Sequence, residues 1–342
     1  MNNGDTRTPD PEGRPPEQPL TPEPQPRAAY AGRMETERAK TAGGTCLLVG
    51  CGYVGARLAR RLKDQNPVLA WVRTEASAAA LARAGIAAVR VDLDLESQDP
   101  PYQVPSDLEA LVYLAPPSGT GREDLRLARF LKALGTARPG VLLYFSTTGV
   151  YGDTGGAPVD EDSPVAPRED RSRQRLEAEG RVARWCEARG VRWVVFRVPA
   201  IYGPHRLPLD RLQQGEPVLR DEDSGPGNRV HVEDLVAACL AALQRPVAGV
   251  FNLTDGQPVS MAEFTAQVAA LAGLPTPRRV SWEEAQACLS PGLLAFLRDS
   301  RRVTSRRGSE LGWTPRYGTI SDGIRASLLE MGWARPSGAA IQ

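Results

Sequence analysis

The chain has 342 residues, 41% of them hydrophobic, and carries a formal net charge of +1. This length suits two domains or one domain with a lid, and the near balance of charge gives no reason to expect nucleic acid or a membrane surface as a partner. No apolar run approaches the roughly 18 residues that a membrane-spanning helix needs.

Residues 1–43 are polar and rich in proline. Few large apolar residues are present, so this segment cannot bury enough surface to offset the entropy lost on ordering it. We therefore expect a disordered tail at 1–43. An inert extension is one interpretation of this tail, and a polyproline II docking segment is the other.

A strand, a glycine turn and a helix are predicted next, at 45–62. Residues 46–49 form an apolar run of strand length, and the sequence GCGYVG follows at 50–55. Apolar residues then recur at helical spacing, at Val54, Leu58 and Leu62. This context turns a GxGxxG pattern into a candidate dinucleotide site.

Each glycine of this turn has its own expected role. Gly50 permits the tight turn, Gly52 lets the backbone approach a pyrophosphate, and Gly55 lets the helix pack close to the strand. The phosphates would meet the unpaired N–H groups at the start of the helix, where Tyr53 and Val54 stand. The alternative is a glycine-rich turn without a ligand.

Strands and helices alternate through the rest of the first half. Further strands are predicted at 68–72, 87–91, 111–114, 141–145 and 191–198, and helices at 75–83, 123–134 and 172–188. After Pro199 the pattern becomes irregular, with short helices near 232–243, 261–271 and 282–289. The predicted fold class is α/β. A doubly wound parallel sheet, the NAD(P)-binding Rossmann fold, occupies 44–200, and a smaller, mostly helical substrate-binding cap occupies 201–335.

The cysteines and histidines exclude several kinds of site. Five cysteines form no CxxC pair, and the odd count argues against a full disulfide framework, so the cytoplasm is the expected compartment. His205 and His231 are the only histidines. A His-rich metal centre or a Ser-His-Asp hydrolase is therefore not expected, and no metal is predicted.

The end of the second strand favours NADP(H) over NAD(H), although NAD remains an alternative. NAD-binding sheets usually carry an acid there, whereas this strand ends in Arg73, which suits a 2′-phosphate. An arginine exposed to solvent at a strand end is the other interpretation. Further cofactor-binding residues are expected where later strands end, at Asp92, Leu93, Ala115 and Pro199.

Four stretches together resemble the short-chain dehydrogenase/reductase superfamily, in its extended or atypical branch with NAD-dependent epimerase/dehydratase character. They are GCGYVG at 50–55, FSTTGVYGD at 145–153, FRVPAIYGP at 196–204 and NRVHVEDLVAACLAAL at 228–243. FNLTDGQPVSMAEF at 251–264 is similar to the segment that returns from the cap in these proteins. The resemblance implies a small-molecule substrate, and it would permit a homodimer paired through two helices.

The resemblance also implies a catalytic hydroxyl and a Tyr-x-x-x-Lys dyad. Thr147 matches the hydroxyl position, so we expect it to polarise a substrate carbonyl. The dyad is missing, because Arg171 stands in place of the tyrosine and Arg175 in place of the lysine. A guanidinium has no acceptor and does not deprotonate in proteins, so Arg171 cannot act as general base. Arg175 is expected to hold the cofactor in place of the lysine.

Four other side chains are candidates for the rim of the active site. Tyr202 is a substitute proton donor and Tyr151 a substrate-lining residue, although packing is the alternative for each. His205 is a candidate acid or base that would contact substrate. Arg229 would face a substrate anion, or else form a surface ion pair with Glu233 or Asp234. His231 is expected to order the entry into the following helix.

Two classes of function compete. The first is an NADP(H)-dependent oxidoreductase, or an epimerase/dehydratase relative, that acts on a carbonyl or sugar-like molecule. The second is a non-catalytic NADP(H)-binding sensor or regulatory protein, which the missing Tyr-Lys dyad favours. A GxGxxG dehydrogenase of another family is a third interpretation, and FSTTGVYGD and NRVHVEDL count against it.

Overall fold

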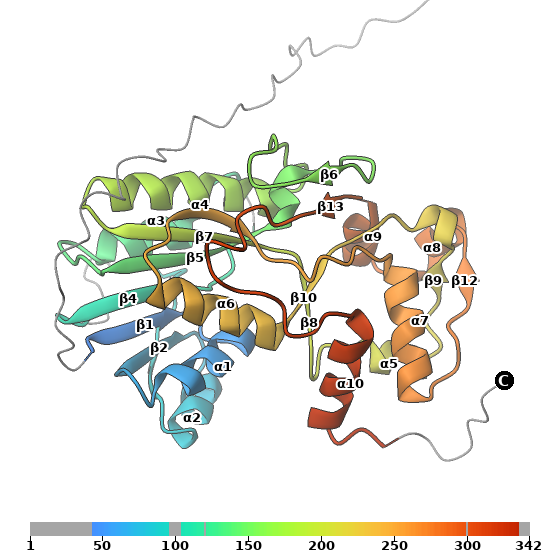
Figure 1. Cartoon of the computed structure of the whole chain (residues 1–342), viewed down its shortest axis with the longest axis horizontal. Coiled ribbons are helices and arrows are strands. Elements are labelled where there is room, and N and C mark those ends of the chain that lie inside the picture. Colours follow the sequence, from blue (N-terminus) through green and yellow to red (C-terminus); the bar gives the residue numbers. More distant parts are fainter. Residues whose placement is uncertain (1–42, 96–103, 120, 299, 335–342) are drawn as a thin grey trace, which may run out of the picture.

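A parallel sheet runs through the computed structural model, which describes residues 43–95, 104–119, 121–298 and 300–334. The seven strands lie in the order β11-β7-β5-β4-β1-β2-β3 (Figure 1). Their bounds are β1 (Thr45–Val49), β2 (Val68–Val72), β3 (Ala87–Arg90), β4 (Leu108–Tyr113), β5 (Val141–Thr147), β7 (Arg192–Val198) and β11 (Gly249–Asn252). The order reverses between β1 and β4, which places a ligand crevice beyond their carboxyl ends. The predicted Rossmann fold is confirmed.

Helices cover both faces of this sheet. One face carries α1 (Tyr53–Leu62), α2 (Glu75–Arg83) and α6 (Val232–Gln244), and the other carries α3 (Leu125–Ala133) and α4 (Asp170–Glu187). The spacing of apolar residues explains how α1 packs, because Val54, Leu58 and Leu62 are all buried against the sheet. Since both faces are covered, the strands read as nearly continuous apolar runs.

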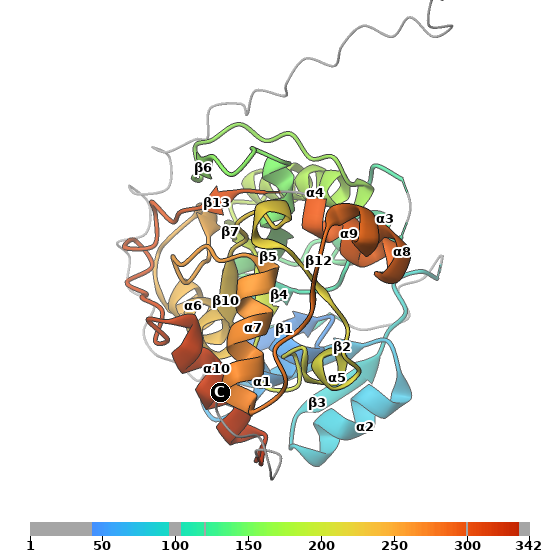
Figure 2. The same cartoon turned by 90° about the vertical axis from the view of Figure 1, so that its right-hand side faces the viewer.

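The cap lies beside the sheet, on the right in Figure 1 and facing the viewer in Figure 2. Its first core joins β8 (Ala200–Tyr202), α5 (Leu209–Gln213), α7 (Met261–Ala272) and α10 (Ile320–Glu330). Strand β10 (Arg229–His231) pairs with β8. A second, smaller core joins β9 (Val218–Leu219), β12 (Arg279–Val280), α8 (Trp282–Cys288) and α9 (Pro291–Arg298). Among the described residues, no helix is both long and apolar enough to cross a membrane.

The 3-10 helix η1 (Thr148–Tyr151) directly follows β5. A second 3-10 helix, η2 (Asp221–Asp223), follows β9. The strand pair β6 (Pro158–Val159) and β13 (Arg302–Val303) joins the loop after η1 to the segment after α9. Residues far apart in the sequence are thereby held over the carboxyl edge of β5.

The expected division of the chain at residue 200 is not a division in space. Helix α6 packs against α1 and β5, and β11 pairs with β7 at the edge of the main sheet. Residues 232–252 therefore belong to the layers of the main sheet rather than to the cap. The physical reason is burial, because Val250 and Phe251 and the apolar face of α6 complete the cores on the two faces of the sheet.

Candidate cofactor and active site

Gly50 sits where the chain turns from β1 into the helix that follows. Its φ of 79° lies in the left-handed region, and its N–H donates to the carbonyl of Trp71 at 3.0 Å. A Cβ on Gly50 would lie 2.5 Å from the amide nitrogen of Ala115, which is backbone and cannot move aside. Ala115 is buried at the end of β4. Only glycine therefore fits between these two strand ends.

The first turn of α1 is open above Gly52. Gly52 is exposed, and a Cβ there would meet only the carbonyl oxygen of Gly50, at 4.0 Å. No side chain of the described residues caps this helix, and its first turn, which begins with Tyr53 and Val54, contains no acidic residue. Uncapped N–H groups at the positive end of a helix dipole fit an anion. This cradle fits the pyrophosphate of a dinucleotide.

Gly55 allows α1 to lie close to the strand that precedes it. A Cβ on Gly55 would lie 3.2 Å from the Sγ atom of Cys51. That distance is tighter than ordinary van der Waals contact, so a larger residue would push the helix outward. The position of the first turn of α1 thus depends on the small size of Gly55.

Arg73 and the loop after β3 lie at the adenosine end of this edge. Arg73 is exposed directly after β2, and Thr74 next to it caps α2 by accepting from the N–H of Ser77. After β3, Leu93 is buried and Asp92 accepts a hydrogen bond from the N–H of Asp94 at 3.0 Å. Arg73 therefore carries its charge at the surface, beside the loop after β3.

Thr147 ends β5 at the other half of the same edge. It is half-buried, and its Oγ1 accepts from the N–H of Gly149 at 3.1 Å. Since that bond uses a lone pair, the hydroxyl hydrogen remains available to a substrate oxygen. Thr147 pairs in register with Val198, so half-buried Pro199 comes next to it at the edge of the sheet.

Tyr151 does not line a substrate surface. It is 2% exposed, and its hydroxyl donates to Asn252 Oδ1 at 2.8 Å and accepts from Arg197 Nη1 at 3.0 Å. Arg197 also pairs with Glu179, which accepts a further hydrogen bond from the hydroxyl of Ser146. This buried network corrects the expected role of Tyr151, because its hydroxyl is already satisfied inside the protein.

This network was not predicted from the sequence, although one residue of β7 indicated it. Arg197 stands inside the apolar run of β7, all of which is buried. A charged residue within a buried strand needs a buried partner of opposite charge. The partner, Glu179, comes from the middle of α4, and the spacing of charges along that helix does not distinguish it from its exposed neighbours.

Arg171 and Arg175 do not reproduce the missing dyad. Arg171 is exposed on the first turn of α4. Arg175 is 7% exposed, and its Nη1 donates to the hydroxyl of Tyr144 at 3.0 Å. Tyr144 points into the core between the sheet and α3 and α4. The Arg175 guanidinium, which was expected to hold the cofactor, is thus hydrogen-bonded to the buried Tyr144 instead.

Tyr202 lies in the core of the cap rather than at its rim. It is 2% exposed and stacks edge-on against His231 and Phe264, with ring centroids 5.1 and 5.7 Å away. Burial raises the pKa of its hydroxyl, and the nearby carboxylate of Asp255 raises it further. A phenol that is hard to ionise and shielded from solvent is poorly placed for proton transfer, so its position favours the packing alternative.

His205 is exposed on the loop between β8 and α5. Its φ of 61° is the only positive value for a non-glycine residue among the described residues, and its N–H contacts the Sδ atom of Met331 at 3.1 Å. The next residue, Arg206, stacks over the ring of Tyr53 at 4.3 Å. The Tyr53 hydroxyl also donates to the carbonyl of Pro204 at 2.8 Å, so this loop lies beside the first residue of α1.

Arg229 is buried and faces backbone carbonyls instead of a substrate anion. It is 3% exposed, donates to the carbonyl of Val259 at 2.8 Å, and lies over the ring of Phe264 at 4.3 Å. Both earlier expectations for Arg229 are therefore corrected, since Glu233 pairs with Arg57 at 3.0 Å instead.

Asp234 and His231 have structural roles around the start of α6. Asp234 accepts from the backbone N–H groups of Arg316 and Tyr317. His231 caps the helix by accepting from the N–H of Glu233 at 3.2 Å, as expected from the sequence. Its burial lowers its pKa to about 4, so the ring is neutral at pH 7.

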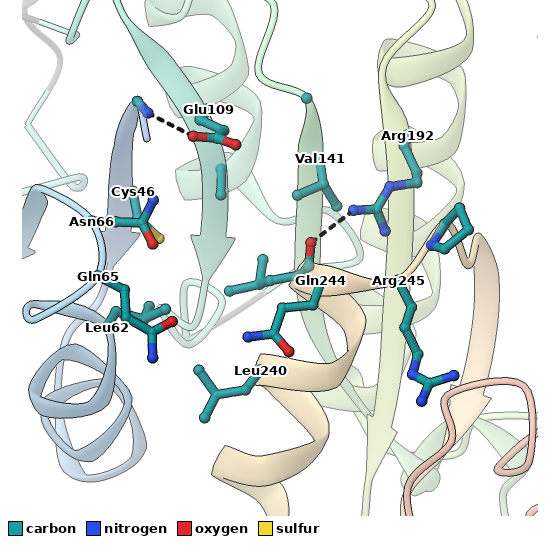
Figure 3. A pocket seen from close by; sticks show the side chains of 15 residues that line it. Cys46, Leu62, Gln65, Asn66, Glu109, Val141, Arg192, Leu240, Gln244 and Arg245 are labelled. Atoms are coloured by element: carbon teal, nitrogen blue, oxygen red, sulfur yellow. Dashed lines mark hydrogen bonds between the residues drawn. The ribbon is translucent and has the colours of Figure 1, made fainter. Parts of the chain in front are cut away.

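A pocket of about 430 Å³ lies at the opposite, amino-terminal edge of the sheet (Figure 3). It is lined by the first residues of several strands, including Cys46 and Val141, and by the last turns of α1 and α6. Arg192 on its wall is 8% exposed and donates to the carbonyl of Ala242 at 2.9 Å. None of the candidate cofactor or substrate residues lines this pocket.

Known proteins resemble this chain along most of the part described above. The model of the NAD dependent epimerase/dehydratase family matches residues 46–254. Protein YeeZ of Escherichia coli (strain K12) is 29% identical over 241 residues, which make up 68% of this chain and 85% of YeeZ. A 3-diazoavenalumate denitrifying reductase of a Streptomyces species is 28% identical over 185 residues, 49% of this chain. The chain spans only 59% of that reductase.

A solved structure agrees with these sequence relatives. A functionally unknown conserved protein from Silicibacter pomeroyi DSS superposes with a TM-score of 0.72 at 30% sequence identity. The superposition covers 84% of this chain and 99% of that protein, so it includes the cap as well as the sheet. Together with the family match over the glycine turn, β5 and β7, these findings place the chain in the NAD dependent epimerase/dehydratase family, within the extended short-chain dehydrogenase/reductase branch.

Proposed function

We propose that this chain is an NADP(H)-dependent oxidoreductase, or an epimerase/dehydratase relative, that acts on a carbonyl or sugar-like small molecule. The observation that carries the proposal is the shared edge of the sheet. The open turn at Gly52, the exposed cation of Arg73 and the hydroxyl of Thr147 all follow carboxyl ends of its strands. A nicotinamide nucleotide bound there would supply hydride transfer.

Different residues along that edge would bind the nucleotide and the substrate. The first-turn N–H groups of α1 would bind the pyrophosphate, and Arg73 would bind the 2′-phosphate. Thr147 would donate its hydroxyl hydrogen to the substrate oxygen where negative charge develops. The proton that completes the reaction would come from His205 or from water, because Tyr202 is buried and Arg171 cannot release one.

The relatives support chemistry at this site without naming its substrate. The Streptomyces relative is described as a reductase, which agrees with hydride transfer. Since the chain spans about three fifths of that protein, its substrate is not carried over.

A sensor or regulatory protein that binds NADP(H) without turnover is the second candidate. The observation that favours it is the position of Arg175, which is bound to the hydroxyl of Tyr144 instead of being free to hold a ribose. Nucleotide binding relies on the glycine turn and can persist without proton transfer. The two candidates therefore share a binding site and differ only in chemistry.

Nucleotide binding is tested by fluorescence titration of the full chain with NADPH and, in parallel, NADH. We expect NADPH to bind more tightly than NADH. Gly52→Ala should weaken both, by about tenfold, because a methyl group would occupy the approach to the helix amides. Gly318→Ala, which also meets open space, is the matched control and should bind as the unchanged protein does. Absence of binding of either nucleotide to the unchanged protein would refute the proposal.

Catalysis is tested with a panel of carbonyl and sugar-like substrates and two variants of Thr147. Thr147→Val removes the hydroxyl at nearly constant volume, and Thr147→Ser keeps it. We expect turnover to fall by roughly a hundredfold or more in the valine variant and to be largely retained in the serine variant. Equal turnover by all three would remove Thr147 from the mechanism. Tight NADPH binding with no turnover across the panel would favour the sensor.

A further inference from the structure

Arg126 joins the two loops that follow β3 and β4. Its Nε and Nη2 atoms bind the two carboxylate oxygens of Asp94 side by side, at 2.6 and 2.5 Å. Its Nη1 atom donates to the carbonyls of Pro116 at 3.0 Å and Pro117 at 3.1 Å. Arg126 stands in the first turn of α3, whose start is fixed by the buried cap Asp124. The guanidinium is therefore held at the adenosine end of the nucleotide edge.

Asp94 is an acidic residue in the loop after β3, and three arginines act on it. The hydrogen bonds from Arg126 lower its pKa most, and the positive charges of Arg129 and Arg73 lower it further. Strands β2 and β3 are paired, with Val72 opposite Arg90, so Arg73 and Asp94 both follow the ends of neighbouring strands. The Asp94 side chain is 44% exposed, whereas the Arg126 side chain is 15% exposed. The carboxylate therefore faces solvent, and its negative charge is neutralised by Arg126.

We infer that Arg126 is a specificity-determining residue, because its pairing with Asp94 keeps Arg73 available for a 2′-phosphate and so favours NADP(H) over NAD(H). This inference rests on the proposed nucleotide site and adds a residue to it. The Arg73 side chain is exposed directly after β2, whereas both carboxylate oxygens of Asp94 are bound by Arg126. Bidentate pairing to Arg126 satisfies that carboxylate first.

The two nucleotides should respond differently to loss of this pair. A 2′-phosphate carries between one and two negative charges, so an unpaired carboxylate nearby repels it and also competes for Arg73. A ribose 2′-hydroxyl has no charge, and a carboxylate can accept its hydrogen bond. Freeing Asp94 should therefore weaken NADPH binding while leaving NADH binding nearly unchanged.

A double-mutant cycle tests the inference on the full chain. Arg126→Ala, Asp94→Ala and the double variant are each titrated with NADPH and with NADH. We expect Arg126→Ala to weaken NADPH binding by about tenfold and NADH binding by less than about threefold. The double variant should recover NADPH affinity to within about threefold of the unchanged protein, since the competing carboxylate is gone. Lys132→Ala, which removes an exposed positive charge from the same helix, is the control and should bind both nucleotides normally.

Asp94→Ala alone gives a second, independent test. This variant removes only an acid from the surface, and we expect it to bind NADPH at least as tightly as the unchanged protein. A loss of NADPH affinity in Asp94→Ala would overturn the inference. Equal loss of NADPH and NADH binding in Arg126→Ala, without recovery in the double variant, would overturn it too, because Arg126 would then only brace the two loops. Either result leaves the proposed function intact if the unchanged protein still prefers NADPH.

Discussion

Glu179 on α4 and Arg197 on β7 form an ion pair inside the protein, with Arg197 Nη2 2.8 Å from Glu179 Oε2. Their side chains are 7% and 6% exposed. Burial alone would lower the pKa of Arg197, but the charge and hydrogen bonds of Glu179, together with those of Tyr151, outweigh it and raise that pKa. The pair is hydrogen-bonded to Ser146 on one side and Tyr151 on the other. It thus fixes α4 and η1 against the strand that ends in Thr147.

We expect removal of one member of this pair to destabilise the fold strongly. Glu179→Ala leaves the Arg197 guanidinium buried without its counter-charge, which typically costs about 3–5 kcal/mol. Urea denaturation of the full chain measures the change in free energy of unfolding. Glu177→Ala, on the same helix and half-buried, is the control and should cost less than about 1 kcal/mol. A small effect of Glu179→Ala would mean that the pair contributes little.

Arg73→Ala should reduce the preference for NADPH. A charged hydrogen bond contributes roughly 1.5–3 kcal/mol, which corresponds to about ten- to a hundredfold in affinity. NADH binding should change little, because a ribose hydroxyl carries no charge for Arg73 to neutralise. Parallel titrations with both nucleotides measure the ratio, and Arg83→Ala at the far end of α2 controls for the loss of one positive charge. An unchanged ratio would remove Arg73 from nucleotide selection.

Tyr202→Phe distinguishes packing from proton transfer. The Tyr202 hydroxyl is buried and has no hydrogen-bond partner among the described residues. A buried hydroxyl without a partner is unfavourable, so its deletion should leave the free energy of unfolding unchanged or raise it by up to about 1 kcal/mol. We also expect turnover of any confirmed substrate to be unchanged. A large loss of turnover with normal stability would instead identify Tyr202 as the proton donor.

Asp255 should make the free energy of unfolding depend on pH. It follows β11, its Oδ1 accepts from the N–H of Gln257 at 3.0 Å, and its Oδ2 has no partner among the described residues. Burial raises its pKa to about 6, and the bond from Gln257 and the charge of Arg229 only partly oppose this. An unfolded aspartate has a pKa of about 3.9. The folded state therefore holds a proton between pH 4 and 6 that the unfolded state has lost.

The sign follows from that difference in bound protons. Stability contributed by protonated Asp255 is fully present below about pH 4 and is lost as the pH rises through about 6. Asp255→Asn should thus become more stable than the unchanged protein as the pH increases, by on the order of 2 kcal/mol at pH 7 and by nearly nothing at pH 4. Denaturation curves across this range measure the difference. Asp210→Asn, which removes an exposed carboxylate from α5, is the control variant.

Local patterns predicted the nucleotide-binding half of the chain well. The helix expected at 172–188 is observed at Asp170–Glu187, and the strand expected at 191–198 at Arg192–Val198. These elements were accessible because hydrophobic periodicity acts over a few residues. The strand β11 and the helix α10 were not predicted. Strand β11 has only four residues, all buried, and gives little periodic signal. Helix α10 mixes small, polar and apolar residues, so its periodicity is also weak.

The glycine turn, the alternation of strands and helices, and the missing Tyr-Lys dyad could all be predicted from the sequence alone. Gly50, for example, is needed because its φ of 79° is a property of the local backbone. The burial of Tyr151 and Arg229 and the pairing of Arg126 with Asp94 became visible only in the folded protein. Burial and charge pairing depend on partners that are distant in the sequence. Asn252, for example, reaches Tyr151 across 101 residues, a distance over which no local pattern extends.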